Sequence, residues 1–194
     1  MTEARETTAV GVEALVDAAK AGDEARLRAL VAERAHLVLQ RLPSGESPLM
    51  AALYRGHYAI VDSLVQLGAE VDVFVAAATG RLLELTTALA QADAATSYSY
   101  DGWTPLHLAA FFGQIDAIQA LLAAGADVRV ISRNSLENTP LHAATAGKHS
   151  EAALLLLAAG ADPDVPDAGG ASAMTIAAEN SMHLVVDAFR ARRF

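Results

Sequence analysis

Two short segments recur in this sequence at a fixed spacing, and this repetition constrains the fold more than any other feature. The tetrapeptide Thr-Pro-Leu-His at Thr104–His107 returns 35 residues later at Thr139–His142. The tripeptide Gly-Ala-Asp at Gly125–Asp127 returns at the same spacing at Gly160–Asp162. Weaker copies extend the pattern to six units, with a period near 33 residues and one interval of 24, starting at Glu13, Ser47, Val71, Thr104, Thr139 and Ser172. Self-similarity at such a period is typical of stacked repeat architectures.

Each unit predicts a pair of short helices. A Thr or Ser before Pro is an N-cap followed by a residue whose backbone suits the first helical turn. A glycine such as Gly113 then indicates a tight turn between the helices, and a leucine-rich stripe such as Ile118, Leu121 and Leu122 indicates a second helix. Two helices of about ten residues cannot bury their apolar faces alone, so the units must stack.

The Thr-Pro-Leu-His motif in two units, with relaxed versions in the others, resembles the ankyrin-repeat family over about residues 13–188. This resemblance implies an all-α ankyrin-repeat solenoid of stacked antiparallel helix pairs with short β-hairpin fingers. We therefore expect an N-terminal tail over residues 1–12, a single domain of about six repeats over residues 13–189, and a C-terminal tail over residues 190–194.

Several units depart from the pattern. Only five residues separate Glu70 from Ala76, so the hairpin between the second and third units is missing, and we expect Val71–Val75 to be the weakest junction. Conversely, Arg129–Asn138 lengthens the next-to-last finger by two residues. The end units lack the signature and carry charged residues that suit a polar cap or a helix C-terminus: Arg26, Arg28, Glu33 and Arg34 in one, Arg190, Arg192 and Arg193 in the other.

Composition excludes several function classes. Hydrophobic residues make up 53% of the chain, which excludes wholesale disorder. A net charge of −9 and a pI near 5.0 argue against nucleic acid or an anionic membrane as the main partner. The absence of cysteine excludes disulfides and thiolate chemistry. No export signal or membrane-spanning stretch is recognisable, so we expect a cytoplasmic protein.

Catalytic chemistry has little support in the sequence. His107 and His142 recur once per repeat, and the resemblance implies that each is a structural hydrogen-bonding residue beneath a hairpin. The other histidines lack metal-ligand spacing. Asp162, Asp164 and Asp167 only faintly resemble a calcium loop, and a solvated finger is the favoured interpretation. We expect no enzyme activity, no metal and no cofactor.

Aromatic residues gather around the fourth unit, at positions that by resemblance to the family face the concave partner-binding groove. Clustered aromatics are typical of protein-binding hot spots. The alternative is that Trp103 shields the base of the finger and one phenylalanine packs between repeats. The candidate partner-binding residues are Tyr98, Tyr100, Asp101, Trp103, Phe111 and Phe112, with a second, weaker group of Arg133, Asn134 and Leu136 in the lengthened finger.

We therefore predict a non-catalytic scaffold that binds another protein through the concave groove and the fingers around the fourth repeat. A stoichiometric inhibitor or regulator of a partner enzyme would use the same groove and is the alternative. Two long stretches without Lys or Arg, 82–128 and 149–189, favour a partner with a basic or apolar segment, although these acids could equally cap helices. We expect a monomer, with self-association through an exposed end repeat left open.

Overall fold

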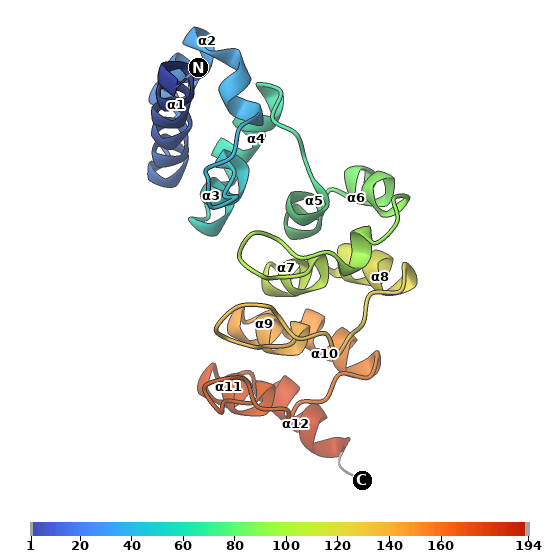
Figure 1. The fold of residues 1–194 in the computed structure, drawn as a ribbon. Coiled ribbons are helices and arrows are strands. Elements are labelled where there is room, and N and C mark those ends of the chain that lie inside the picture. The colour runs from blue at the N-terminus through green and yellow to red at the C-terminus, as the bar shows by residue number, and fades with distance from the viewer. Residues whose placement is uncertain (1, 193–194) are drawn as a thin grey trace. The chain divides into compact units, whose positions relative to one another are not determined.

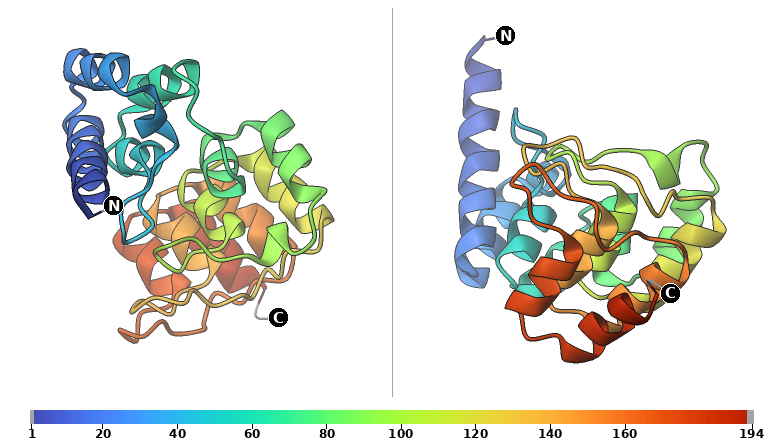
Figure 2. Two further views of the ribbon diagram at one scale, coloured as in Figure 1. Left: turned by 45° about the horizontal axis from the view of Figure 1, so that its top comes forward. Right: turned by 90° about the horizontal axis from the view of Figure 1, so that it is seen from below.

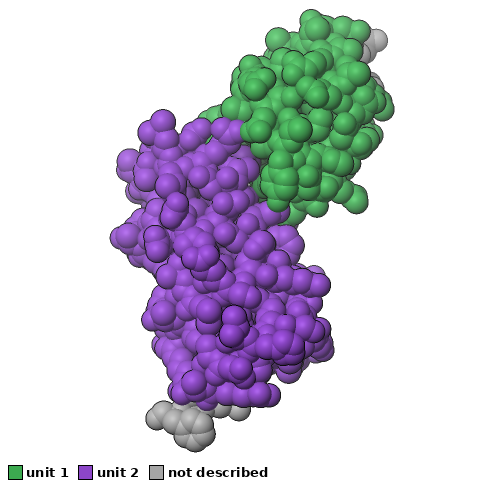
Figure 3. All heavy atoms as spheres, turned by 180° about the vertical axis from the view of Figure 1, so that it is seen from behind, with its two compact units in different colours: residues 1–71 green, residues 72–194 purple. Residues whose placement is uncertain are grey.

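The computed structural model describes the backbone of residues 2–192 and the side chains of residues 11–192. It divides the chain into two compact units, Met1–Val71 and Asp72–Phe194, where the sequence predicts a single domain (Figure 3). The boundary falls in the short stretch that lacks a hairpin. Each unit is described by itself.

The first unit is built from helical elements only. They are α1 (Thr2–Ala21), α2 (Glu24–Glu33), the 3-10 helix η1 (Ala35–Leu39), α3 (Pro48–Tyr54) and α4 (Tyr58–Gln66). Helix α1 packs against α2, α3 and η1, and α3 packs against α4 (Figure 1). Leu15, Leu27, Leu37, Leu53 and Leu64 are fully buried and form the centre of this unit.

Residues 2–12, which the sequence predicts to be an N-terminal tail, are part of helix α1 in the structure. Helix α1 begins at Thr2, so Glu13, the predicted start of the first unit, lies in the middle of a helix of 20 residues. Alanine and glutamate, which are frequent in this stretch, are strong helix formers, and Leu15 and Val16 anchor the helix on the core.

The second unit contains four helix pairs. They are α5 (Val73–Thr79) with α6 (Leu82–Leu89), α7 (Pro105–Phe111) with α8 (Ile115–Ala123), α9 (Pro140–Ala146) with α10 (Ser150–Ala158), and α11 (Ala173–Glu179) with α12 (His183–Ala191). A short 3-10 helix, η2 (Ala94–Thr96), follows α6. Helices α5, α7, α9 and α11 stack in one layer, and α6, α8, α10 and α12 stack in a second (Figures 1 and 2).

Small residues allow the inner helices to approach closely. Ala109 and Ala110 of α7 and Ala143 and Ala144 of α9 are completely buried. Alanine combines the highest helix propensity with the smallest side chain that still covers apolar surface. The alanine-rich segments of the sequence thus form the contacts between neighbouring inner helices.

Side-chain caps begin the inner helices. Ser47, Thr104 and Ser172, at three of the predicted starts, accept a hydrogen bond from the backbone N–H three residues later. Thr139 caps α9 in a capping box. In the third unit the cap is Asp72 rather than Val71, and its carboxylate lies 2.8 Å from the backbone nitrogen of Val75.

The fingers are loops rather than β-hairpins. Three loops of the second unit are each closed at the base by one backbone hydrogen bond, from Ser99 N to Trp103 O at 2.8 Å, from Ser132 N to Asn138 O at 2.9 Å and from Asp167 N to Ala171 O at 2.8 Å. Residues 2–192 contain no β-strand, and the one isolated bridge recorded there joins Pro166 and Ser172. The expected hairpin fingers are therefore present as stacked tight turns without a ladder.

The last helix extends into the segment predicted as a C-terminal tail. Helix α12 extends to Ala191, so Arg190 and Ala191 belong to it rather than to a tail, while Arg193 and Phe194 lie outside the described residues. Among residues 2–192, no helix combines the length and the apolar character that crossing a bilayer would require.

Candidate partner-binding surface

His107 and His142 are structural residues that tie each inner helix to the following finger. The Nε2 atom of His107 lies 2.9 Å from the carbonyl oxygen of Asn138, and that of His142 lies 3.2 Å from the carbonyl oxygen of Ala171. A carbonyl oxygen only accepts, so Nε2 must carry the proton. Each Nδ1 atom is then free to accept from its own capping threonine, whose hydroxyl lies 2.8 Å away.

Burial keeps both imidazoles neutral. Desolvation lowers the pKa of His107 from 6.5 to about 4, and the neighbouring His142 adds to the shift. Desolvation also lowers the pKa of His142, opposed by its bonds to backbone carbonyls. Protonation at Nδ1 would end its acceptor role at the cap, so these groups serve the fold and not proton transfer.

Trp103 is buried at the base of its finger. Its side chain is 8% exposed, and its ring centroid lies 5.3 Å from that of Phe111 in an edge-to-face arrangement and 5.8 Å from that of His107. His107 and Phe111 are four residues apart on one face of α7, and Trp103, just before the helix, packs against both. This geometry supports the shielding alternative for Trp103, whose side chain is not an open contact surface.

Phe111 and Phe112 lie at the end of α7 and are partly exposed. Their ring centroids are 5.2 Å apart in a near-perpendicular arrangement. The Phe111 ring packs against the buried Trp103 on one side and is partly exposed to solvent on the other. The aromatic candidates thus form a chain of rings that runs from a buried tryptophan to a partly exposed pair.

The fingers at 97–104 and 131–138 are bonded directly to each other. The backbone nitrogen of Arg133 donates to the carbonyl oxygen of Gly102 at 2.7 Å, and the amide of Asn134 donates to the carbonyl oxygen of Asp101 at 3.0 Å. Side chains add a second link, because the guanidinium carbon of Arg133 lies 3.9 Å from the centre of the Tyr98 ring. The structure thus brings the two predicted groups of residues together in one double finger.

Tyr98 and Asp101 also have internal roles. The Tyr98 hydroxyl donates to the carbonyl oxygen of Ile131 at 3.3 Å, and the Asp101 carboxylate accepts from the Ser99 hydroxyl at 2.5 Å. The Ser99 hydroxyl in turn accepts from the backbone nitrogen of Trp103 at 3.0 Å. These contacts stiffen the finger from within.

Two predicted residues present large apolar surface to solvent. Tyr100 is 39% exposed and Leu136 is 50% exposed. Ile131, which sequence reasoning did not select, is 51% exposed in the same long finger. The available signal was a pair of β-branched apolar residues, Val130 and Ile131, in a segment predicted to be a loop. Gly102 was also missed, although its backbone is the contact point between the two fingers.

The third finger extends this arrangement. The backbone nitrogen of Ala168 donates to the carbonyl oxygen of Leu136 at 2.9 Å. Asp167 is turned inward, since its Oδ1 atom accepts from the backbone nitrogens of Gly169 and Ala171 at 2.9 Å each. Fingers 97–104, 131–138 and 165–172 therefore form one continuous hydrogen-bonded platform, which we call the three-finger platform.

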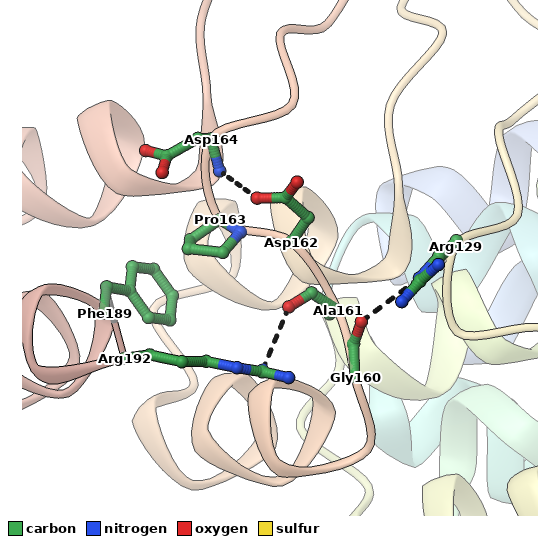
Figure 4. A pocket seen from close by; sticks show the side chains of 8 residues that line it. All are labelled: Arg129, Gly160, Ala161, Asp162, Pro163, Asp164, Phe189 and Arg192. Atoms are coloured by element: carbon green, nitrogen blue, oxygen red, sulfur yellow. Dashed lines mark hydrogen bonds between the residues drawn. The ribbon is translucent and has the colours of Figure 1, made fainter. Parts of the chain in front are cut away.

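A cavity of about 260 Å³ lies at the far end of the second unit, beside α12 (Figure 4). Arg192 reaches the carbonyl oxygens of Leu157 and Ala161 at the end of α10, and Arg129 Nε donates to the carbonyl oxygen of Gly160 at 3.3 Å. Both guanidinium groups thus donate to carbonyl oxygens at or just after the C-terminus of α10, where a cation is favourable. Arg192 was expected to serve the C-terminus of the last helix, and in the structure it bonds to carbonyls near the end of α10 instead.

Asp162 and Asp164 line the same cavity without forming a cation site. Asp162 Oδ1 accepts from the backbone nitrogen of Asp164 at 3.0 Å, the bond of a turn (Figure 4). Within the described residues, no group of three acidic, histidine or cysteine side chains is arranged to hold a metal ion. The arrangement is that of a structural turn at the base of a finger.

Comparisons with known proteins agree with this architecture. A model described as "Ankyrin repeat" matches residues 44–74 and 101–133, and one described as "Ankyrin repeats (many copies)" matches residues 121–177. A stretch of 31 residues is 58% identical to oxysterol-binding protein-related protein 1 of Homo sapiens, and it covers 16% of this chain and 3% of that protein. With stacked helix pairs, Thr-Pro-Leu-His caps and these two matches, the chain belongs to the ankyrin-repeat family.

Proposed function

We propose that this chain is a non-catalytic scaffold that binds a partner protein through the groove and fingers around the fourth repeat. Ankyrin repeats generally mediate protein–protein interaction and are typically non-catalytic modules. The proposed binding residues lie on fingers 97–104 and 131–138 and at the end of α7, with Tyr100 and Leu136 as the exposed apolar contacts. The partner meets a monomer of this chain in the cytoplasm.

The observation that carries the proposal is the bonding between the two fingers. Because Arg133 N and Asn134 Nδ2 hold the backbone of residues 101 and 102, the loop is already ordered before any partner arrives. Ordering a loop on binding costs free energy, so a pre-ordered loop binds more tightly with the same contacts. A double finger that is ordered in this way and exposes Tyr100, Ile131 and Leu136 can present apolar contacts to a partner without rearranging.

Charge indicates the kind of partner. Residues 72–194 contain thirteen acidic and seven basic side chains, a net charge of −6. The negative electrostatic potential that this charge creates speeds association with a basic protein and disfavours association with an acidic one. The proposed partner therefore contributes a segment with apolar and basic residues.

The test is affinity capture from lysate with wild type and a Tyr100→Ala/Leu136→Ala variant. Trp103 is avoided, because its removal would open a cavity in the repeat itself. The matched control is Leu83→Ala/Leu184→Ala, which removes two leucines that are 78% and 76% exposed on α6 and α12.

A protein retained by wild type and by the control but lost by the finger variant supports the proposal. Equal retention by all three would place the binding surface elsewhere. The captured protein also separates the two functional classes. If it is an enzyme whose activity falls in proportion to added chain, the inhibitor alternative replaces the scaffold.

A further inference from the structure

A second cavity, of about 310 Å³, lies within the second unit at the base of the three-finger platform. Two connectors form it, one leading from α8 to finger 131–138 and the other from α10 to finger 165–172. Its lining residues are Val128, Arg129, Ile131, Thr139, Asp162 and Val165. Ile131 joins it to the double finger, since the Ile131 carbonyl accepts the hydrogen bond of the Tyr98 hydroxyl.

The wall of this cavity is aliphatic. Val128 and Val165 are partly exposed, and Ile131 is 51% exposed, so all three retain apolar surface that a ligand could cover. Thr139 is 5% exposed and its hydroxyl is already engaged by His142 Nδ1 at 2.8 Å. The Thr139 hydroxyl is therefore not available to a ligand, and only the methyl group of this side chain remains for contact.

One basic and one acidic side chain, Arg129 and Asp162, line the cavity. Arg129 Nε donates to the Gly160 carbonyl oxygen at 3.3 Å, so its guanidinium is held toward the end of α10. Residues 72–194 carry a net charge of −6. Asp162 in this negative field favours a cation next to the apolar space.

We propose that this cavity binds one aliphatic side chain of an extended partner segment, with a lysine or arginine next to that side chain facing Asp162. The size supports a single side chain, because about 310 Å³ stands at the lower limit of cavities that hold small-molecule ligands. Charge excludes a second copy of this chain as the preferred occupant, since two chains of net charge −9 repel each other. The inference rests on the proposed function and adds to it an anchor outside Tyr100 and Leu136.

The experiment follows the methyl signals of the valine, isoleucine and leucine side chains by NMR while capped tripeptides are added to the full chain. The probe is acetylated and amidated lysine-leucine-lysine. Lysine-glycine-lysine lacks the aliphatic group, and glutamate-leucine-glutamate reverses the charge. We expect saturable shifts at Val128, Ile131 and Val165, with binding of the leucine peptide about tenfold or more tighter than that of either comparison peptide.

A Val165→Phe variant, which fills the cavity with a larger apolar ring, should abolish the shifts at Val128 and Ile131. Leu83→Ala, at a position on α6 that is 78% exposed and outside the cavity, should leave them unchanged. The dispersion of the other methyl signals reports whether Val165→Phe is folded, and Ile131→Ala serves as the second variant, with binding weakened severalfold.

Equal shifts with the glycine peptide, shifts confined to other methyl groups, or unaltered binding by both cavity variants would overturn the proposal. The outcome is separate from that of the capture experiment. The tripeptides report on the cavity alone, whereas capture reports on Tyr100 and Leu136, so either proposal can fail without the other.

Discussion

The Nε2 atom of His107 lies 2.9 Å from the backbone carbonyl oxygen of Asn138, 31 residues further along the chain. This bond joins the inner helix of one repeat to the base of the next finger. It also requires a neutral ring, because Nδ1 must accept from the cap residue Thr104. The stacking of these repeats is thereby coupled to pH.

We expect the free energy of unfolding to fall as the pH is lowered from about 6.5 to 4. The pKa of His107 is 6.5 in the unfolded reference and about 4 in the folded chain. Between these values the unfolded chain takes up a proton that the folded chain does not, which costs up to about 1.4 kcal/mol per pH unit. His142, whose pKa is lowered for the same reason, adds to the slope. Urea unfolding at a series of pH values measures it.

The control for this prediction is a pair of glutamine variants. His107→Gln should lower stability at pH 7 and flatten the pH slope, since the titrating group is gone. His183→Gln, at an exposed position on α12, should leave the slope as in wild type. A slope as steep in His107→Gln as in wild type would assign the pH dependence to other groups.

Alanine variants of Trp103 and Tyr100 should differ in the free energy of unfolding, because the first residue is buried and the second is exposed. Trp103→Ala removes a buried ring packed on Phe111 and His107, so we expect a loss of about 3–5 kcal/mol in the free energy of unfolding. Tyr100→Ala, at a position that is 39% exposed, should change it by less than about 1 kcal/mol. Denaturant unfolding at pH 7 compares the two, and equal losses would contradict the assignment of Tyr100 to the contact surface.

Gly102 should tolerate no side chain, because a Cβ atom there would collide with the neighbouring finger. Gly125, which has a similar φ but no close neighbour, serves as the comparison. The φ of Gly102 is +81°, and a Cβ atom there would lie 2.6 Å from the carbonyl carbon and oxygen of Arg133. Gly125 has a φ of +89° but no atom within 4 Å of its Cβ position. Both alanine variants bear the strain of a left-handed backbone, and only Gly102→Ala also pushes the two fingers apart.

We therefore expect Gly102→Ala to lower the free energy of unfolding by at least about 1 kcal/mol more than Gly125→Ala does. It should also weaken partner capture, because the double finger loses its pre-ordered backbone. Unfolding curves and capture are measured on the same preparations. Equal behaviour of the two variants would mean that the fingers can separate without consequence.

Sequence reasoning predicted the elements whose signals are local. The caps at Thr104 and Thr139 and the turn at Gly113 depend on residues within a few positions of each other. The start of α1 at Thr2 was missed, because no cap residue or repeat motif marks it. In the third unit the deletion removed the Thr-Pro signal, and Asp72 took over the cap.

The candidate site was only partly predictable for a different reason. A tryptophan beside a cap looks the same in the sequence whether it is buried or exposed. Trp103 is buried because its ring packs against His107 and Phe111, while its finger is bonded to Arg133, some 30 residues away. The sequence grouped the right segments, whereas contacts within and between repeats decided which side chains remain exposed.

The stretch 68–75 should be the least protected part of the folded chain. Neighbouring repeats stabilise each other through their interfaces, and this junction has no finger to add hydrogen bonds of the kind that join the three-finger platform. The division of the chain into two compact units falls at Val71 and Asp72, within this stretch. Hydrogen exchange followed by mass spectrometry should show faster exchange there than in the backbone of α7 and α9.

Removing the Asp72 cap tests the same prediction by perturbation. Asp72→Ala deletes the acceptor 2.8 Å from Val75 N, at a cost of about 0.5–2 kcal/mol, and should accelerate exchange in α5. Because repeat stability is a sum of local and nearest-neighbour contributions, α11 should be unaffected. Ser172→Ala, which removes the cap of α11, should give the reverse pattern. Uniform protection in the wild type, or a uniform response to either variant, would show that the chain opens as one cooperative body and that the missing finger carries no weakness.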